Sequence, residues 1–360
     1  MPSQIKKVFR SIFPKHGSTL PAMQTAIGQL AKGGVDTLQE VQIPVEKPTS
    51  TDILVSVKAV SVNPIDYKLR ARSDTTSKVD GPFVMGYDAS GIVEAVGDKV
   101  TLFKKGDEVF YSGSATRSGS NATYQLVDER IVALKPKTWS HTDSAALPLV
   151  SLAAWEAMVE SMAIPVSETE NPKSILIING AGGVGTVALT LASKVLKLKT
   201  VIATASRPET VAWAKKFGAT HVINHTLPLG PQLEEQGLHF DYAFICGGTT
   251  DKNLTELVPL INPLGKIASI LPAESPLALQ AGMMKSISFH WALMFVKSMT
   301  NTRPETQGQI LKQIAAYADA GVFSNDIVTE RYKFDVEGLR TVHTKLEGGK
   351  TIGKIVLARE

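Results

Sequence analysis

The sequence predicts an α/β protein with two domains, one rich in β-strands and one built on a doubly wound parallel sheet. Three observations support this fold class. The chain has 360 residues, 43% hydrophobic and 20% charged, which is enough for two hydrophobic cores. Short strand-like segments dominate from about Met23 to Leu134. Apolar strands then alternate with helical segments from about Ser174 to Leu271.

The first half of the chain is rich in short strands. The segment Ile53–Val62, ILVSVKAVSV, alternates apolar and polar side chains, which is the pattern of a half-buried strand. Further strand-like runs follow, separated by glycine-rich and charged turns: GIVEAVG, DEVFY and ATYQLVD. These runs predict a domain of barrel or sandwich type.

Near Thr142 the pattern changes to helices and buried strands. Residues 143–162 are a helical stretch, and Ser167–Lys173 is a polar connector. Apolar strands then alternate with helices, as in a parallel sheet covered on both faces: SILIING, GVGTVALTLASKVL, TVIAT, RPETVAWAKKFG, FDYAFIC, TELVPLI and GKIASIL.

The end of the chain returns to the first domain in the predicted organisation. Two helices, ILKQIAAYADAG and DVEGLRTVHTKLEGG, precede a last strand, KIVLA. We expect that strand to rejoin the β-rich domain. The predicted boundaries are a basic amphipathic extension at residues 1–22, a β-rich domain at 23–155 and 300–360, and a parallel-sheet domain at 156–299.

The net charge of +4 arises from the N-terminal extension. Its basic residues are Lys6, Lys7, Arg10 and Lys15, and it has no acid, whereas the rest of the chain has 34 basic and 34 acidic residues. This balance argues against a nucleic-acid partner. The longest apolar runs also fall short of the roughly 18 residues of a membrane span.

Two interpretations of the extension remain open. Apolar residues at helical spacing, with basic residues on the other face, resemble a mitochondrial transit peptide. A single arginine and Pro14 fit a simple extension ahead of the core instead. We therefore expect a cytoplasmic protein, with the mitochondrial matrix as the alternative.

A glycine turn stands where the first strand of the parallel-sheet region meets a helix. In GAGGVG, Gly180, Gly182 and Gly185 match the pattern G-x-G-x-x-G. The first glycine permits a tight turn, the second lets a pyrophosphate approach the backbone, and the third lets the helix pack on the strand. The helix N-terminus offers free N–H groups to phosphates. Together with Gly183 and Val184, these glycines predict a dinucleotide site.

The end of the next strand indicates which dinucleotide binds. An NAD site usually has an acidic residue about 20 residues beyond the glycines. Here Ser206 and Arg207 follow the strand TVIAT, and Glu209 comes later. An arginine fork and a serine hydroxyl suit a 2′-phosphate, so we predict NADPH. The alternative is that SRPE only starts a helix.

Several motifs together resemble one protein superfamily. The β-rich domain, AGGVG and GKIVL are similar to the medium-chain dehydrogenases/reductases. More narrowly, SVNPIDYKLR, GYDASGIVEAVG, GSNATYQLVDERIVALKPK and SFHWALMF resemble its zinc-independent quinone oxidoreductase branch, in the subgroup labelled "zinc-type alcohol dehydrogenase-like". The likeness covers Met23–Leu357, with the motifs in family order. It implies a GroES-like catalytic domain and a Rossmann domain that binds NADPH.

The resemblance also implies that the chain works without zinc. Zinc alcohol dehydrogenases of this superfamily have a catalytic cysteine near the position of Asn63 and a histidine at that of Tyr87. They also carry a four-cysteine lobe, whereas this chain has a single cysteine, Cys246. Because Cys246 follows the apolar run YAFI, we interpret it as a buried thiol rather than a nucleophile.

The resemblance places the hydride acceptor near Asn63, Tyr67 and Tyr87. Their amide and hydroxyl groups are candidates to donate hydrogen bonds to an acceptor oxygen. The alternative for Asn63 is local, because NPID is also a turn that starts a helix, with Asn63 and Asp66 bonded to backbone. For Asp66 we favour that structural role.

Further cofactor contacts follow by position in the family. They are His225 on the adenosine side, Leu271 and Phe289 beside the nicotinamide, Lys354 near the cofactor, and Cys246 at the end of its strand. Structural alternatives remain for several of them. His225 also fits a surface turn, Phe289 fits the core, and Lys354 fits a solvated lysine.

The predicted function is an NADPH-dependent reduction of quinones or α,β-unsaturated carbonyls. Their hydride adducts are stabilised anions that need no Lewis acid, so the protein mainly positions the reactants. Two alternatives stay open: a trans-2-enoyl-thioester reductase and a non-enzymatic NADPH-binding protein. Relatives often form dimers or tetramers through edge strands, so we also expect a homodimer or homotetramer.

Overall fold

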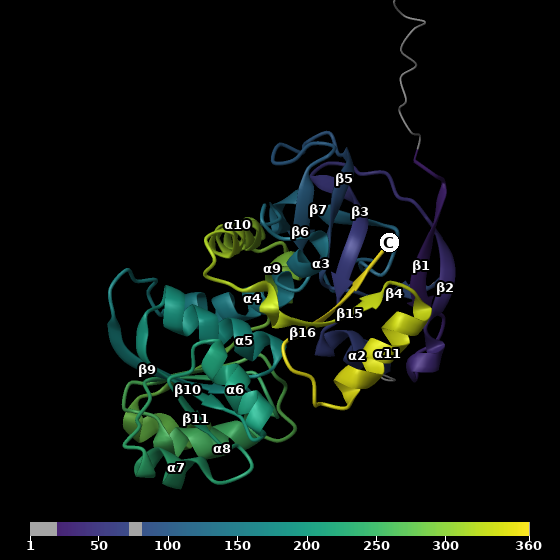
Figure 1. Cartoon of the computed structure of the whole chain (residues 1–360). Coiled ribbons are helices and arrows are strands. Elements are labelled where there is room, and N and C mark those ends of the chain that lie inside the picture. The colour runs from purple at the N-terminus through teal and green to yellow at the C-terminus, as the bar shows by residue number, and fades with distance from the viewer. Residues whose placement is uncertain (1–19, 72–80, 360) are drawn as a thin grey trace, which may run out of the picture.

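The structure, a computed structural model, describes residues 20–71 and 81–359 (Figure 1). The predicted extension at residues 1–22 therefore lies outside the described residues, apart from its last three. Two domains are evident, and the chain passes from the β-rich domain to the parallel-sheet domain and back. None of the helices in the described ranges is long and apolar enough to cross a membrane.

The parallel-sheet domain contains the Rossmann-type sheet that the sequence predicted. Its strands lie in the order β11-β10-β9-β12-β13-β14, all parallel. They are β9 (Asn171–Ile178), β10 (Leu198–Thr204), β11 (His221–Ile223), β12 (Tyr242–Ile245), β13 (Lys266–Ser269) and β14 (Ser288–Trp291).

Helices cover both faces of this sheet because β9 is apolar on both sides. Ile175 and Ile177 belong to one hydrophobic cluster, and Leu176 and Ile178 to another. The covering segments are α5 (Gly183–Thr190), η4 (Leu191–Val195), α6 (Pro208–Lys216), α7 (Leu229–Glu235), α8 (Thr250–Leu260), η5 (Leu279–Lys285) and α9 (Phe295–Thr300). Such two-sided burial is typical of parallel sheets.

The β-rich domain contains two sheets. The larger has the order β15-β16-β3-β5-β6-β8, with β7 also paired to β3, and the smaller has the order β2-β1-β4. The strands are β1 (Met23–Gln29), β2 (Gln39–Pro44), β3 (Asp52–Ser61), β4 (Phe83–Val84), β5 (Ala89–Val96), β6 (Glu108–Tyr111), β7 (Tyr124–Asp128), β8 (Val132–Leu134), β15 (Val328–Lys333) and β16 (Lys354–Ala358). The predicted strand at 53–62 is thus β3.

The remaining helices join or flank the two domains. They are η1 (Val35–Thr37), α2 (Pro64–Ala71), η2 (Glu129–Ile131), α3 (His141–Ser144), α4 (Pro148–Trp155), η3 (Glu156–Ser161), α10 (Glu305–Asp319), η6 (Asn325–Ile327) and α11 (Val336–Glu347). The stretch predicted as one helix over 143–162 is divided into three by Pro148 and by a wide π turn at η3. One hydrophobic cluster runs from the β-rich domain through α4 to α5.

Strand β16 returns to the first sheet, as the sequence predicted. It pairs antiparallel with β3, between Val356 and Ser61, and parallel with β15. Figure 1 shows β16 and α11, in yellow, beside the purple strands of the β-rich domain. The exact domain boundaries at 23–155, 156–299 and 300–360 stay a prediction.

Candidate functional site

The glycine turn has the tight geometry that its sequence predicted. Asn179 follows β9 with a left-handed backbone, φ 65°, and Gly182 caps α5. A Cβ atom at Gly185 would lie 2.2 Å from the carbonyl oxygen of Asn179, and one at Gly180 would lie 2.8 Å from the Cβ of Ala203. These positions admit no side chain, so the first turn of α5 approaches the strand closely and presents its amides.

A strap from the β-rich domain lies against this turn. The backbone of Gly353 bridges to Gly182, and the Gly353 amide donates to the carbonyl of Ala181 at 2.9 Å. A Cβ atom at Gly183 would lie 2.8 Å from the Cδ of Lys354. The turn is therefore held between its own domain and the segment that leads into β16.

Several predicted cofactor residues meet at one edge of the sheet. Ser206 follows β10, His225 follows β11, Cys246 follows β12 and Leu271 follows β13. These are the carboxyl ends of parallel strands, where ligands of such sheets bind. The carbonyl of Leu271 accepts a hydrogen bond from the Thr250 hydroxyl at 2.5 Å.

Cys246 is a partly buried residue whose thiol is hydrogen-bonded. Its Sγ donates to the carbonyl oxygen of Ile178 at 2.9 Å. Burial raises the pKa of the thiol to about 12. The group is therefore protonated at neutral pH, which agrees with its interpretation as a structural thiol rather than a nucleophile.

Ser206 lines a hollow of about 460 Å³ together with Lys215 and Asn224. Arg207 caps α6 and is half-buried. Its Nε lies 3.1 Å from Glu209, and a terminal nitrogen donates to the carbonyl of Lys350 at 3.0 Å. The guanidinium is thus held between Glu209 and the backbone of Lys350, in the segment that leads into β16.

Two predicted contacts have clear structural surroundings. His225 is exposed, and the neighbouring Asn224 uses its side-chain oxygen in a local turn to Thr226 at 2.9 Å. Phe289 packs against the hydrophobic cluster on the α7 and α8 side of the sheet, 5.0 Å from the Trp291 ring. These surroundings match the alternatives of a surface turn and a core aromatic, and cofactor contact by either residue stays a prediction.

Asn63 is the centre of a buried polar network. Its Nδ2 donates to Asp88 at 2.6 Å, and its Oδ1 accepts from Lys354 Nζ at 2.6 Å. Lys354 also donates to Asp88 at 3.2 Å, and Asp88 accepts the Leu149 amide at 2.7 Å. Lys354 is therefore not a solvated lysine, because its ammonium is buried in the β-rich domain.

Burial governs the ionisation of this network. It raises the pKa of Asp88, against the lowering effect of Lys354 and Asn63. It also lowers the pKa of Lys354, against the attraction of Asp88. The short contacts between Asn63, Asp88 and Lys354 hold the carboxamide in one orientation.

Asp66 has the structural role that the NPID turn predicted. One oxygen, Oδ2, accepts the backbone amide of Asn63 at 2.7 Å. The other, Oδ1, is buried without a hydrogen-bond partner among the described residues. Burial raises the pKa of Asp66 to about 7, and the charge of Asp88 adds to this effect.

Tyr87 and Tyr67 differ in their surroundings. Tyr87 is buried and meets the ring of Phe295, from α9 of the other domain, edge-on at 5.1 Å. Burial and the charge of Asp66 raise its pKa. Tyr67 is half-buried on α2, where burial and the charge of Glu347 on α11 raise its pKa. The placement of both tyrosines near the hydride acceptor stays a prediction.

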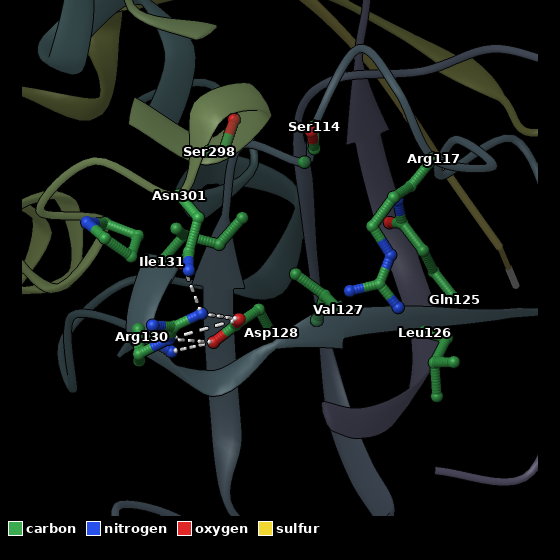
Figure 2. A pocket seen from close by; sticks show the side chains of 12 residues that line it. Ser114, Arg117, Gln125, Leu126, Val127, Asp128, Arg130, Ile131, Ser298 and Asn301 are labelled. Atoms are coloured by element: carbon green, nitrogen blue, oxygen red, sulfur yellow. Dashed lines mark hydrogen bonds and ion pairs between the residues drawn. The ribbon is translucent and has the colours of Figure 1, made fainter. Parts of the chain in front are cut away.

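A separate small cavity, of about 60 Å³, lies between β7, η2 and the end of α9 (Figure 2). Its arginines are paired, Arg117 with Asp52, and Arg130 with Asp128 and Asn301. Figure 2 shows the Arg130 group on one side of this space and Arg117 with Gln125 on the other. The predicted site residues do not line it.

Sequence reasoning missed two residues of the site. Asp88 stands in the motif GYDASG, directly after Tyr87. An acidic residue next to the position of a zinc ligand was the signal that could have identified it. Lys215 lies on α6, and only the fold brings it to the hollow beside Ser206. Across residues 20–71 and 81–359, the structure brings together no group of three or more His, Cys, Asp and Glu side chains that suits a metal ion.

Comparisons with known proteins agree with this architecture. Residues 49–137 match the alcohol dehydrogenase GroES-like domain, and residues 217–357 match the zinc-binding dehydrogenase family. A zinc-type alcohol dehydrogenase-like protein of Staphylococcus aureus is 40% identical over 332 residues, covering 91% of this chain and 96% of that protein. A chloroplastic NADPH-dependent alkenal/one oxidoreductase of Arabidopsis thaliana is 30% identical over 332 residues, covering 90% and 77%.

Solved structures share the fold over nearly the whole chain. A putative zinc-dependent alcohol dehydrogenase from Rhizobium etli is 40% identical, with a TM-score of 0.85, covering 94% of this chain and 98% of that one. The Escherichia coli quinone oxidoreductase complexed with NADPH has a TM-score of 0.76 at 22% identity, covering 93% and 99%. The GroES-like and Rossmann domains, the glycine turn and these relatives show that the chain belongs to the medium-chain dehydrogenase/reductase superfamily.

Proposed function

We propose that this oxidoreductase uses NADPH to reduce quinones or α,β-unsaturated carbonyls and that it does so without a metal ion. The observation that carries the proposal is the Asn63–Asp88–Lys354 network. It fixes the amide of Asn63 beside a buried ammonium, and by the family resemblance Asn63 stands near the position of a zinc-ligating cysteine. The alkenal/one oxidoreductase relative supports the enone part of the proposal.

The residues at the sheet edge fit NADPH. The first turn of α5 offers backbone N–H groups to a pyrophosphate, and the lack of side chains at Gly180 and Gly185 lets this turn pack closely on Ala203 and Asn179. Ser206 and Lys215 line the hollow beside β10, and Arg207 follows Ser206 in the chain, so a hydroxyl and two cations are candidates to bind the 2′-phosphate. Bound NADPH supplies the hydride, and these side chains hold it in place.

Asn63 is suited to orient the acceptor. Its Nδ2 makes one short bond, to Asp88, and one long contact, to the carbonyl of Ser61 at 3.5 Å. The second N–H is therefore only weakly engaged and is available to an acceptor oxygen without any rotation of the amide. Because Lys354 holds the carboxamide oxygen, the amide keeps this orientation as negative charge develops on the acceptor.

The same network does not fit a zinc ion. The ammonium of Lys354 lies 2.6 Å from Asn63 and 3.2 Å from Asp88, so a positive charge already stands among the candidate ligands. The pKa of the Tyr87 hydroxyl is raised by burial, so the group stays neutral and is a poor zinc ligand. We therefore include no metal in the proposed reaction.

We also propose that two copies of the chain join through β14. This strand is the edge of the parallel sheet, and exposed apolar side chains surround it, including Trp291 at 53% and Leu293 at 52% exposure. Contiguous apolar surface along a sheet edge is typical of an association site. Pairing of the two edges would cover both copies of this surface.

The deciding experiment is a titration of the purified protein with NADPH and NADH, followed by turnover on 1,4-benzoquinone and a medium-chain enal with and without a chelator. We expect tighter NADPH binding and chelator-insensitive turnover of one or both acceptors. If NADPH binds but neither acceptor is reduced, two alternatives remain, a non-enzymatic NADPH-binding protein and an enoyl-thioester reductase. An assay with an enoyl-thioester substrate distinguishes them. Loss of activity with the chelator would overturn the metal-free proposal.

A further inference from the structure

The strap that lies against the glycine turn consists of residues 348–353, GGKTIG, between α11 and β16. Both of its ends are anchored in the β-rich domain. Glu347, the last residue of α11, is paired with the buried Arg70 of α2, and Lys354 begins β16. Between these anchors the strap crosses to the nucleotide edge of the Rossmann domain, so it contacts both domains.

The outer half of the strap is bonded to the residue predicted to bind the 2′-phosphate. The carbonyl of Lys350 accepts a hydrogen bond from a terminal nitrogen of Arg207 at 3.0 Å. A guanidinium has five N–H groups, so Arg207 can hold this carbonyl and a phosphate at the same time. The Arg207 side chain is 38% exposed, and charged hydrogen bonds to a phosphate would fix it more firmly than water does.

The inner end of the strap is pinned to the glycine turn. The Gly353 amide donates to the carbonyl of Ala181 at 2.9 Å. Gly353 has φ 61°, and a Cβ atom there would lie 2.5 Å from the carbonyl oxygen of Ile327. Only glycine fits this position, so the strap passes the turn at one fixed point.

The next residue, Lys354, extends from the glycine turn to the acceptor amide. A Cβ atom at Gly183 would lie 2.8 Å from the Cδ of Lys354, so the lysine stem lies against the start of α5. Its ammonium donates to the Asn63 carboxamide oxygen at 2.6 Å. The Thr329 hydroxyl donates to the carbonyl of Lys354 at 3.2 Å, which holds its backbone in place. One side chain therefore joins the cofactor site to the acceptor site.

We propose, building on the proposed reductase function, that the strap couples the 2′-phosphate site to the acceptor site. The 2′-phosphate holds Arg207, and Arg207 holds the carbonyl of Lys350. The strap, pinned at Gly353, then holds Lys354 and the amide of Asn63 in the orientation that receives the acceptor. Lys350 and Lys354 are thus positioning residues. NADPH is preferred over NADH in the rate of hydride transfer as well as in affinity.

The outer half of the strap has the freedom that such coupling requires. Gly349 has φ 65°, and a Cβ atom there would meet no atom within 4 Å. Gly349 and Lys350 are both exposed. A ligand that fixes this half through Arg207 narrows the range of positions open to the inner half, which is how binding at one site shifts the conformation of another.

The first test uses adenosine 2′,5′-bisphosphate, the part of NADPH that carries the 2′-phosphate but no nicotinamide. NMR of protein with isotope-labelled asparagine reads the side-chain amide of Asn63 and that of Asn224, which lines the hollow. The variants Asn63→Asp and Asn224→Asp assign the two signals. We expect the bisphosphate to shift both signals. Adenosine 5′-monophosphate, which lacks the 2′-phosphate, should shift that of Asn224 alone.

Two variants interrupt the strap without touching Lys354 or Asn63. One has two glycines inserted between Thr351 and Ile352, and the other, Arg207→Gln, loses the contact to Lys350. In both, saturating bisphosphate should still shift the Asn224 signal and should leave that of Asn63 at its ligand-free position. The matched control has two glycines inserted after Gly237, in an exposed turn with φ 60°, and should behave as the wild type.

The second test measures the single-turnover rate of 1,4-benzoquinone reduction by protein saturated with NADPH or NADH, so that affinity does not contribute. We expect the wild type to react about tenfold faster with NADPH, because misplacement of an orienting group lowers the rate. The lengthened strap should lower the NADPH rate to the NADH rate and leave the NADH rate unchanged. A merely structural disturbance would lower both rates.

The outcomes separate this proposal from the proposed function. The coupling is wrong if the bisphosphate shifts Asn224 but not Asn63 in the wild type, or if the lengthened strap keeps the Asn63 shift. Equal single-turnover rates with NADPH and NADH also overturn it. If the bisphosphate shifts neither signal, the NADPH site fails and the coupling fails with it. If both signals shift as expected but no quinone or enone is reduced, the reductase function fails while the coupling stands.

Discussion

The ammonium of Lys354 lies 2.6 Å from the carboxamide oxygen of Asn63, although 291 positions separate the two residues in the chain. Asn63 stands just before α2, and Lys354 begins β16. The contact exists because β16 returns to pair with β3 after the whole Rossmann domain. It sets the orientation of the amide on which the proposed acceptor site depends.

Replacing Lys354 by Met should disable the site. Asp88 would then be a buried carboxylate without its cation, and we expect the free energy of unfolding to fall by about 3–5 kcal/mol. The rate of quinone reduction should fall at least tenfold, because the Asn63 amide loses its fixed orientation. Urea denaturation and steady-state kinetics measure the two effects. Lys104→Met, at an exposed ion pair, is the control, and equal behaviour of the two variants would refute the prediction.

Replacing Arg207 by Gln should weaken NADPH selectively. A charged hydrogen bond to a phosphate contributes about 1.5–3 kcal/mol, so the Kd for NADPH should rise about 10- to 100-fold, while that for NADH stays the same. Calorimetric titration with both nucleotides tests this. Lys199→Gln, in the same strand β10 but at its opposite end, should change neither value. An equal loss of affinity for NADPH and NADH would mean that Arg207 does not bind the 2′-phosphate.

Replacing Gly185 by Ala should damage the glycine turn. The new methyl group would lie 2.2 Å from the carbonyl oxygen of Asn179, so α5 must shift away from β9. Overpacking of this kind costs about 1–3 kcal/mol of stability, and nucleotide affinity should fall with it. Gly348→Ala is the control, because its nearest atom would be 3.3 Å away. Thermal denaturation with and without NADPH distinguishes them, and wild-type behaviour of Gly185→Ala would contradict the model of a tight turn.

Replacing Glu156 by Gln should change how stability depends on pH. Glu156 lies 3.0 Å from Gln307 Nε2 and 3.3 Å from Lys297, and burial raises its pKa to about 7. A carboxyl group whose pKa is raised in the folded state stabilises that state, and the contribution is complete below the unfolded-state pKa of about 4.5. That contribution is lost as pH rises toward 7 and beyond.

The Glu156→Gln variant should therefore match the wild type near pH 4 and exceed its free energy of unfolding at pH 8, by on the order of 2 kcal/mol. Lys297 keeps a partner in the variant, because it also lies 2.7 Å from Glu160. Urea denaturation at both pH values measures the difference. Glu46→Gln, at an exposed position, should give no such difference, and a variant less stable than wild type at pH 8 would disprove the expectation.

Replacing Trp291 by Glu should separate the proposed dimer. A carboxylate beside the β14 edge would have to be buried in the joined sheet, at a cost of several kcal/mol. Analytical ultracentrifugation should show a monomer for this variant and a dimer for the wild type. Leu102→Glu, at another exposed apolar position in the other domain, should stay dimeric. A monomeric wild type would end the proposal.

The fold was predictable because its signals are local. The alternating pattern of Ile53–Val62 and the glycine spacing of Gly180–Gly185 can each be recognised from a few adjacent residues. Short strands at the edges of the sheet were harder to predict. Strands β11 and β14 have three and four residues, and their pairing depends on sheet neighbours far away in the sequence.

The candidate site was only partly predictable for the same reason. The glycine turn, Ser206 and Arg207 follow from their own sequence context. The contact between Lys354 and Asn63 does not, because neither residue has a local pattern that points to the other. The burial that raises the pKa of Asp66 is likewise a property of the packed domain.

The return of β16 also bears on how the protein is made. During synthesis, the Rossmann domain emerges from the ribosome before β15 and β16, which complete the first sheet. Until then β3 lacks a neighbour, and Asn63 and Asp88 lack their cation. The nascent β-rich domain therefore has an exposed strand edge until the end of the chain emerges. Its dependence on chaperones should end only when Lys354 has left the exit tunnel.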